Sequence, residues 1–298
     1  MKILLLGGTG QLGTELRRSL APLAEVVVTT RDGALPDAAP AIALDLTDLD
    51  SIASVVSRIR PDVVVNATAY TAVDRAEDES ELAYRVNAEA PKHLAAACVA
   101  HDSALVHYST DYVFDGTATR PYREDDPTSP LGVYGTSKLA GEAAIRASGG
   151  RHLILRTAWV YATHGQNFLR TMLRVGAERD ELRVVADQVG SPTPVWLIAD
   201  VTATILRKGI DQSGVRHVVT AGQTSWHGFA EAIFDEAFAI GLIDRQPRVL
   251  PITTVEYPTP ARRPAYSVLD CSRLQTEYGV EIPDWRKALR DTLAAPTR

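Results

Sequence analysis

A glycine-rich turn near the start of the chain constrains its fold more than any other feature. An apolar run at residues 3–6 leads into Gly7, Gly10 and Gly13, and leucines at positions 12, 16 and 20 follow with helical spacing. This order predicts a strand, a tight turn and a helix. Glycine permits positive φ and close approach of a ligand, and the N–H groups and dipole of a helix N-terminus favour an anion. We therefore expect a dinucleotide pyrophosphate here; the alternative is a tight strand-to-helix turn without a ligand.

The composition excludes several classes of protein. The 298 residues are 45% hydrophobic and carry a net charge of −6, so nothing indicates a nucleic-acid partner or an anionic membrane surface. Cys98 and Cys271 are the only cysteines, too few for a disulfide framework or a zinc pattern, which suits a reducing cytoplasm. The apolar run at the N-terminus is too short for a signal peptide, and no stretch approaches the ~20 apolar residues that span a bilayer. We expect a cytoplasmic protein.

Short apolar strands alternate with helices along the first half of the chain. The expected strands after the first lie at residues 26–30, 41–46, 61–67, 104–108 and 152–156, with a returning strand at 216–220. Because parallel strands buried on both faces are almost wholly apolar, this alternation predicts an α/β fold with a doubly wound parallel sheet, the Rossmann architecture. A helix is expected at 81–101. Asn87 is a poor helix former inside it, so we expect Asn87 to be exposed, or to hold a buried water or a local kink.

The ends of the second and third strands bear on the choice of cofactor. Thr30 and Arg31 stand where dinucleotide folds often carry an acid for the ribose diol, and a hydroxyl followed by Arg suits a 2′-phosphate better. This favours NADPH, with NADH possible and with Arg31 as an ordinary solvated loop residue as the alternative. Asp45 is placed to accept a hydrogen bond from an adenine amino group, or to cap the helix that follows.

Tyr134 and Lys138 form the strongest catalytic pattern. They lie four residues apart in a segment with helical spacing, so both side chains are expected on one face. A Lys ammonium near a phenol favours the phenolate and lowers the phenol pKa from its usual ~10, which predicts a general acid/base. The alternative is a chance surface pair. The position after five strands of a nucleotide-binding fold favours catalysis.

Five motifs together resemble the extended short-chain dehydrogenase/reductase family. They are GGTGQLG at residues 7–13, NATAYTAVD at 66–74, STDYVFDG at 109–116, YGTSK at 134–138 and DQVGSPT at 187–193. Within this family they are most similar to the reductases that complete dTDP-L-rhamnose synthesis. The resemblance spans nearly the whole chain and is weakest at residues 210–260. It implies hydride transfer from NAD(P)H to C4 of a dTDP-linked 4-keto sugar.

The resemblance also implies roles for individual residues. Thr110, Tyr134 and Lys138 match a catalytic triad in which Thr110 bonds the keto oxygen and Lys138 holds the cofactor ribose. The cofactor is expected to contact Gly7, Gly10, Gln11, Leu12, Arg31, Asp45, Leu46, Ala67, Thr68, Ala69, Tyr70, Tyr134 and Lys138. The sugar nucleotide is expected to contact Asp111, Trp159, Gln188 and Arg263. A solvated basic patch is the alternative for Arg263.

Some relatives are described as metal-bridged dimers with Glu ligands. Glu15 matches one ligand, but Trp196 stands where another is expected, so we predict no metal site. A monomer or a homodimer is expected.

We expect a cofactor domain at residues 1–160 plus 195–220 and a smaller substrate lobe at 161–194 plus 221–298. The alternatives are a sugar-nucleotide epimerase or dehydratase of the same fold, and a non-catalytic regulatory subunit, against which an intact triad argues.

Overall fold

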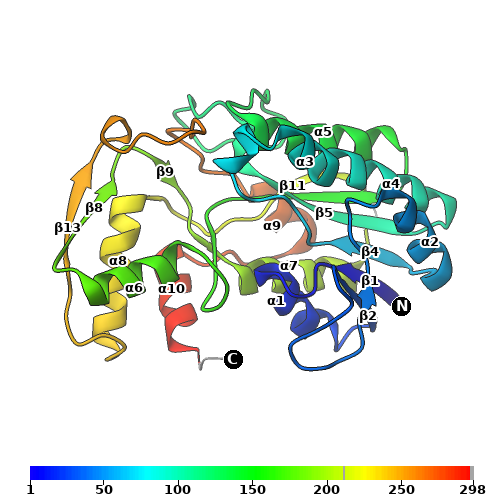
Figure 1. Ribbon diagram of the computed structural model, residues 1–298, viewed down its shortest axis with the longest axis horizontal. Coiled ribbons are helices and arrows are strands. Elements are labelled where there is room, and N and C mark those ends of the chain that lie inside the picture. Colours follow the sequence, from blue (N-terminus) through cyan, green and yellow to red (C-terminus); the bar gives the residue numbers. More distant parts are fainter. Residues whose placement is uncertain (211, 296–298) are drawn as a thin grey trace.

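A parallel sheet of seven strands forms the centre of the fold (Figure 1). The computed structural model describes residues 1–210 and 212–295. Its strand order, β11-β6-β5-β4-β1-β2-β3, with every neighbouring pair parallel, confirms the doubly wound fold, since the chain runs outward from β1 in both directions. The strands are β1 (Lys2–Leu6), β2 (Glu25–Thr30), β3 (Ile42–Ala43), β4 (Val63–Asn66), β5 (Ala104–Thr110), β6 (His152–Thr157) and β11 (Gly214–His217).

Strand β1 shows why helices must cover both faces of this sheet. Ile3 and Leu5 belong to one buried hydrophobic cluster, while Leu4 and Leu6 belong to a second cluster. Successive side chains of a strand point to opposite faces, so a strand that is apolar throughout is stable only between two layers of helices. Each side chain of this size contributes roughly 1.5–3 kcal/mol on full burial.

The helices divide between these two clusters. Leucines of α1 and aliphatic residues of α7 fill the first cluster, joined by Leu274 and Tyr278 of α9. Residues of α2, α4 and α5 fill the second. The helices around the sheet are α1 (Gln11–Leu20), α2 (Leu49–Ile59), α3 (Ser80–Tyr84), α4 (Ala90–Ala100), α5 (Val133–Ala147), α7 (Val195–Lys208) and α9 (Ser272–Tyr278).

The glycine turn has the geometry expected from its spacing. Gly7 has a φ of +82°, which a residue with a side chain rarely adopts. A Cβ at Gly13 would overlap the carbonyl oxygen of Gly7, because the first turn of α1 lies directly on the turn. The strand, the turn and the helix are therefore held together by backbone contacts that only glycine permits.

Three expected strands are shorter than predicted, among them the strand expected at 61–67, which is β4 (Val63–Asn66). The strand expected at 41–46 pairs with β2 only at Ile42 and Ala43, because the Asp45 carboxylate accepts hydrogen bonds from the backbone and hydroxyl of Thr47, each at 2.9 Å, and bends the chain into a turn. The strand expected at 216–220 is β11, which ends at His217. Its partner β6 ends at Thr157, so the ladder stops there.

The helix expected at 81–101 is not a continuous α-helix. It consists of α3, a π-helical turn η2 (Arg85–Glu89) and α4. Asn87 lies inside the π-turn and is fully buried, so its exposed alternative is wrong and the helix is locally irregular around it. π-turns of this kind frequently occur at functional sites.

A second group of elements lies beside the C-terminal ends of the strands, at the left of Figure 1. Strands β8 and β13 pair in parallel there, and aromatic and aliphatic side chains of α6, α8 and α10 pack into a separate core. These elements are β8 (Glu181–Val185), β13 (Arg248–Ile252), α6 (Phe168–Glu178), α8 (Trp226–Ala239) and α10 (Trp285–Ala294). Two short strand pairs join β7 (Val160–Tyr161) to β10 (Thr193–Pro194) and β9 (Val189–Gly190) to β12 (Thr224–Ser225). Three single 3₁₀ turns are η1 (Arg75–Glu77), η3 (Asp111–Val113) and η4 (Thr254–Glu256).

The chain returns from this group to the main sheet after η4. The backbone N–H of Tyr122 donates to the carbonyl of Val268 at 2.9 Å, and that of Asp270 donates back to Tyr122 at 2.8 Å. Segment 253–270 therefore connects the two groups of elements, as the orange trace in Figure 1 shows. None of the helices in the two described ranges has the length and apolar character needed to cross a membrane.

Candidate functional site

A large cavity opens at the C-terminal ends of β1, β2 and β4. Its volume is about 950 Å³. Ligands of doubly wound sheets bind at this edge, where the strand order reverses. Nine residues expected to contact the cofactor line this cavity together: Gly7, Gly10, Arg31, Asp45, Leu46, Ala67, Thr68, Ala69 and Tyr70.

The phosphate end of this cavity fits an anionic ligand. A Cβ at Gly10 would meet only the Gly7 carbonyl oxygen, at 3.4 Å, so the space above Gly10 is open. Gly10 is also the N-cap of α1, and within the described residues no side chain caps this helix, whose first N–H groups face the turn. These features suit a dinucleotide pyrophosphate.

Gln11 and Leu12 are not among the residues that line this cavity, and their side chains have partners elsewhere. The Gln11 amide donates to the carbonyl of Gln166 at 3.1 Å and accepts from Asn167 at 2.7 Å. Leu12 packs on the core beneath the sheet. Any contact of these two residues with a cofactor would therefore be through their N–H groups at the start of α1.

At the far end of the cavity, the side chains suit an adenosine phosphate. Arg31 is exposed at the end of β2. The neighbouring Asp32 carboxylate accepts from the N–H of Ala34 and the hydroxyl of Thr30, both at 3.1 Å, and these bonds lower the pKa of Asp32. Asp45 uses Oδ1 on Thr47, and this bond lowers its pKa. The helix cap that could have explained Asp45 is absent, because Asp48 occupies the N-cap position of α2.

Asn87 ties this cavity to the helix that carries Tyr134. Its side-chain oxygen accepts from the N–H of Tyr70 at 2.9 Å, and its amide nitrogen donates to the Tyr70 carbonyl and to the Ser137 hydroxyl, both at 3.1 Å. Ser137 precedes Lys138 on α5. The buried amide, which lies in the π-turn, therefore links the loop after β4 to α5.

Thr110 and Tyr134 meet at the C-terminal end of β5. Thr110 is the last residue of β5, and Tyr134 lies in the first turn of α5, with its ring 5.4 Å from that of Tyr112. Burial raises the pKa of Tyr134 to about 12, while a hydrogen bond with the Thr110 hydroxyl opposes the rise. Tyr134 is therefore a protonated phenol at neutral pH.

Lys138 lies behind Tyr134, in the interior. Its Nζ donates to the carbonyl of Tyr108 at 2.6 Å and lies 3.3 Å from Nε2 of His107. The side chain is 2% exposed, and burial lowers its pKa to about 8, with Glu142 opposing this shift. Burial of the phenol outweighs any effect of Lys138, so the pKa of Tyr134 is raised and not lowered as the sequence predicts.

Asp111 adds a buried carboxyl to this cluster. The Thr110 hydroxyl donates to its Oδ1 at 2.9 Å, whereas Oδ2 is buried and has no hydrogen-bond partner among the described residues. Burial raises the pKa of Asp111 to about 6, and the hydrogen bond from Thr110 opposes the rise. A buried carboxyl oxygen without a donor is costly, and such groups occur where a ligand supplies the missing donor.

Trp159 is held between two distant segments. It has a φ of +47°, and its ring stacks on that of Trp226 with centroids 3.6 Å apart and planes 6° from parallel. A Cβ at Gly190 would lie 2.5 Å from the Trp159 ring, so Gly190 makes room for the indole. One face of the indole is therefore covered by Trp226.

Arg263 and Gln188, the remaining expected substrate contacts, have partners within the protein. Arg263 forms a two-pronged ion pair with Asp74, at 2.8 and 3.1 Å, and this pairing lowers the pKa of Asp74. The Gln188 amide donates to the Thr254 hydroxyl at 3.0 Å. Arg263 is therefore paired with the motif at 66–74, whereas Gln188 is hydrogen-bonded to η4.

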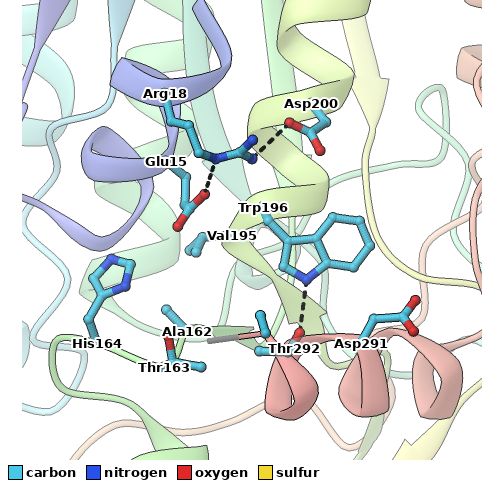
Figure 2. A pocket seen from close by; sticks show the side chains of 11 residues that line it. Glu15, Arg18, Ala162, Thr163, His164, Val195, Trp196, Asp200, Asp291 and Thr292 are labelled. Carbon is cyan, nitrogen blue, oxygen red and sulfur yellow. Dashed lines mark hydrogen bonds and ion pairs between the residues drawn. The ribbon is translucent and has the colours of Figure 1, made fainter. Parts of the chain in front are cut away.

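A separate cavity of about 300 Å³ lies between α1, α7 and α10 (Figure 2). Arg18 bridges its two nearest carboxylates, donating to Glu15 at 3.0 Å and to Asp200 at 3.1 Å. Trp196 projects into the same space and donates to Thr292 at 2.8 Å. In the described part of the chain, no group of three or more His, Cys, Asp or Glu side chains is arranged to hold a metal ion.

Sequence reasoning missed two aromatic residues of the site. Trp226, the first residue of α8 after the Ser225 N-cap, lies in none of the motifs of the sequence, yet its ring stacks on that of Trp159. Tyr112 was read as part of the motif at 109–116 without a role, yet its ring packs edge-on against Tyr134. In both cases the partner lies far away in the sequence.

A doubly wound sheet with an anion-binding glycine turn, next to a Thr, a Tyr and a Lys on β5 and α5, is the architecture of the extended short-chain dehydrogenases/reductases. A family model described as "RmlD substrate binding domain" matches residues 1–297. The chain is 51% identical to the dTDP-4-dehydrorhamnose reductase of Burkholderia thailandensis, over 97% of this chain and 97% of that protein. It is 43% identical to that of Salmonella typhimurium, over 98% and 97%.

Solved structures agree with this relationship. Two dTDP-4-dehydrorhamnose reductases, from Clostridium acetobutylicum and Bacillus anthracis, superpose with TM-scores of 0.89 and 0.86 at 39% and 34% identity, and each comparison covers 98% of both chains. The second is a complex with NADP. The chain belongs to the dTDP-4-dehydrorhamnose reductase family.

Proposed function

We propose that this chain reduces the C4 keto group of dTDP-4-dehydro-L-rhamnose to give dTDP-L-rhamnose, with NADPH as the hydride donor and Tyr134 as the proton donor. NADH is the alternative donor. The observation that carries the proposal is the cluster of Thr110 and Tyr134 at the end of β5, with Lys138 bound behind it to the same strand. Family membership supports the substrate and the cofactor.

The glycine turn and the cavity beside it are proposed to hold the cofactor. The N-terminus of α1 and the open space at Gly10 suit the pyrophosphate, and Arg31 suits the 2′-phosphate. Thr68 and Tyr70 line the cavity on the side nearer to β4. Bound there, NADPH supplies the hydride that adds to the carbonyl carbon.

Tyr134 is proposed to protonate the oxygen that becomes negative as the hydride adds. A phenol with a pKa near 12 is protonated at neutral pH, and an alkoxide is a stronger base than its phenolate, so the transfer is downhill. Thr110 would polarise the same oxygen once its hydroxyl proton turns from Asp111 Oδ1 to the carbonyl. Lys138 holds the cofactor ribose and, when charged, stabilises the phenolate that remains.

The sugar nucleotide is proposed to bind between the two groups of elements, with residues 1–160 plus 195–220 as the cofactor domain and 161–194 plus 221–298 as the substrate lobe. Asp111 Oδ2 is suited to accept a hydrogen bond from a sugar hydroxyl. Trp159 would pack on the sugar, and Arg263 would contact the diphosphate after exchanging Asp74 for it. Gln188 is proposed as a further contact. We place the enzyme in the cytoplasm, where nucleotide sugars are made.

Oxidation of NADPH at 340 nm tests the proposal, with dTDP-4-dehydro-L-rhamnose generated in situ and UDP- and GDP-linked 4-keto sugars as controls. We expect consumption of NADPH with the dTDP sugar and little with the controls. Release of bound NAD(H) from the purified protein, without net oxidation of NADPH, would instead indicate an epimerase or dehydratase. Absence of turnover and of cofactor binding would indicate a regulatory subunit.

A further inference from the structure

Gln11, the first residue of α1, is hydrogen-bonded to a loop that follows it by about 150 positions. This loop, residues 162–167, connects β7 to α6. The Gln11 amide donates to the Gln166 carbonyl at 3.1 Å and accepts from Nδ2 of Asn167 at 2.7 Å. The Gln11 carbonyl accepts from Nε2 of His164 at 3.2 Å, since a carbonyl oxygen can only accept. Three hydrogen bonds therefore join the start of α1 to the 162–167 loop.

The backbone of the 162–167 loop also fits the Gln11 side chain closely. Gly165 has a φ of +71°, and a Cβ at this position would lie only 2.5 Å from Cγ of Gln11. Two carbon atoms that are not bonded to each other cannot approach so closely, so the two segments meet in this way only because residue 165 has no side chain. Van der Waals contact therefore adds to the three hydrogen bonds.

Asn167 also closes the 162–167 loop on itself. Its Nδ2 donates to the carbonyls of Ala162, at 2.9 Å, and His164, at 3.0 Å. Its Oδ1 accepts from the N–H of Arg170 at 3.1 Å, so Asn167 is the N-cap of α6. One amide thus binds Gln11, both halves of the loop and the start of the next helix. The loop is therefore held as a single unit.

The 162–167 loop follows directly on the short segment that carries Trp159. Trp159 precedes β7, and β7 leads into Ala162. The Trp159 carbonyl accepts from the N–H of Thr193 at 3.1 Å, and β7 pairs with β10. Ala158, Tyr161 and Ala162 are at most 2% exposed, so this segment is packed on all sides. A shift of the loop would therefore shift Trp159 as well.

Gln11 therefore belongs to both ends of the site. Its N–H lies in the first turn of α1, where such groups have no partner within the helix and suit the pyrophosphate. We propose that Gln11, through the 162–167 loop, is a positioning residue that sets the place of Trp159, and so of the sugar, relative to the cofactor. The inference rests on the proposed function, because hydride transfer needs the two reacting carbons about 3–3.5 Å apart, and a misplacement of about 1 Å can cost about 10²-fold in rate.

Single-turnover kinetics of Gln11→Met provide the functional arm of the test. Methionine keeps the length of the side chain but removes both of its hydrogen bonds. We expect the rate of hydride transfer to dTDP-4-dehydro-L-rhamnose to fall roughly 10- to 100-fold. The Kd for NADPH should stay within about twofold, because the N–H of residue 11 remains. Asn167→Ser keeps a good N-cap for α6 but loses the donor to Gln11, so it should give the same result and guards against misfolding of the first variant.

The place of Trp159 can be followed without turnover. Fluorine NMR of protein labelled with 5-fluorotryptophan gives a resonance for each of the four tryptophans, and single Trp→Phe replacements assign them. We expect the Trp159 resonance to shift or broaden in Gln11→Met and in Asn167→Ser. The resonance of Trp285, whose ring packs edge-on against Phe229, should stay in place. An unchanged Trp159 resonance in the folded variants would overturn the inference whether or not the protein reduces any sugar.

The matched control is Gln246→Met. The amide of this exposed glutamine donates to the Phe234 carbonyl at 3.4 Å, and within the described residues none of its hydrogen bonds reaches α1. The control should leave both the rate and the Trp159 resonance unchanged. If Gln11→Met and Asn167→Ser lowered only the melting temperature and kept the wild-type rate of hydride transfer, the contact would be purely structural and the inference would fail. If the wild type had no reductase activity, the proposed function would fail, while the spectra would still decide whether Gln11 holds Trp159.

Discussion

The cofactor end and the sugar end of the site are built in different ways. At the cofactor end, the part of the cavity of about 950 Å³ that is proposed to hold the pyrophosphate is formed by backbone and small residues: the turn at Gly7 and Gly10 and the residues after β4. At the sugar end, the candidate side chains are bound to one another. Trp159 is stacked on Trp226, and Arg263 is paired with Asp74.

This difference predicts different responses to ligands. A backbone cradle needs no side chain to move, so cofactor binding should cost little reorganisation. At the sugar end, a ligand that uses Arg263 must replace its ion pair with Asp74, and one that packs on Trp159 has only the part of the ring that Trp226 leaves open. We expect the sugar nucleotide, and not NADPH, to change the environment of these side chains.

Tyr134→Phe tests the group at which the two ends meet, and it should have the largest effect. The change removes the proton and little volume, so kcat should fall by about 10²- to 10⁴-fold, the usual range for one acid/base group. The affinity for NADPH, measured by fluorescence titration, should stay within about twofold, because the proposed pyrophosphate cradle is backbone.

Tyr84→Phe, at a tyrosine of α3 that is not among the residues lining the cofactor cavity, is the control and should leave kcat unchanged. Turnover of Tyr134→Phe within a few-fold of the parent would mean that another group delivers the proton, and the proposed mechanism would then be wrong.

Arg31→Ala should act only on the cofactor end. Loss of a charge-assisted hydrogen bond to the 2′-phosphate is worth about 1.5–3 kcal/mol, so NADPH binding should weaken roughly 10- to 150-fold while NADH binding hardly changes. Arg58→Ala, an exposed Arg on α2, is the control. Equal losses for NADPH and NADH would remove Arg31 from the phosphate site.

Trp226→Ala should act only on the sugar end. A stacked aromatic pair contributes about 0.5–1.5 kcal/mol beyond burial, so loss of the support for Trp159 should lower kcat/KM for the sugar nucleotide roughly 2- to 10-fold without weakening NADPH binding. Phe238→Ala, a half-exposed aromatic on the same helix, should change neither. If Trp226→Ala reduced only the melting temperature, the stack would be part of the core and not of the site.

Asp111→Asn should have the smallest effect, on stability. Because the folded-state pKa of Asp111 is raised to about 6, the penalty on the wild type is absent below the unfolded-state pKa of 3.8, grows as pH rises from 3.8 to about 6, and is complete above that. Asparagine is neutral at every pH, so it does not carry this penalty. In thermal melts, the free energy of unfolding of the variant should exceed that of the wild type by about 1–2 kcal/mol at pH 8, after allowance for a weaker bond with Thr110, and should not exceed it at pH 4. A gain at pH 4 as large as that at pH 8 would contradict the buried charge.

The cofactor end was predictable from sequence because its determinants are local. Glycine spacing, the apolar strand and the following helix lie within one stretch of chain, and the same reasoning located Thr68 and Tyr70 after β4. Tyr134 and Lys138 are one turn apart, so their place on one helix followed directly. Their pKa values did not, because burial and the contacts of Lys138 with β5 are tertiary.

The sugar end was less predictable because its contacts join distant segments. The stack of Trp159 on Trp226 spans 67 positions, and the pair of Arg263 with Asp74 spans 189. The π-turn at Asn87 was foreseen only as an irregularity, since its cause is the link from Tyr70 to Ser137. No periodic pattern encodes such pairings.

The transfer of deuterium tests the central claim most directly. NADPH carrying deuterium at C4 of the nicotinamide, on the side that the enzyme uses, is supplied to the wild type with the dTDP-linked 4-keto sugar, and the product is analysed by mass spectrometry and proton NMR. The account predicts one deuterium at C4 of the sugar, from free NADPH, in each molecule of dTDP-L-rhamnose formed. A product without deuterium at C4, or a tightly bound cofactor that exchanges none with the added NADPH, would contradict it.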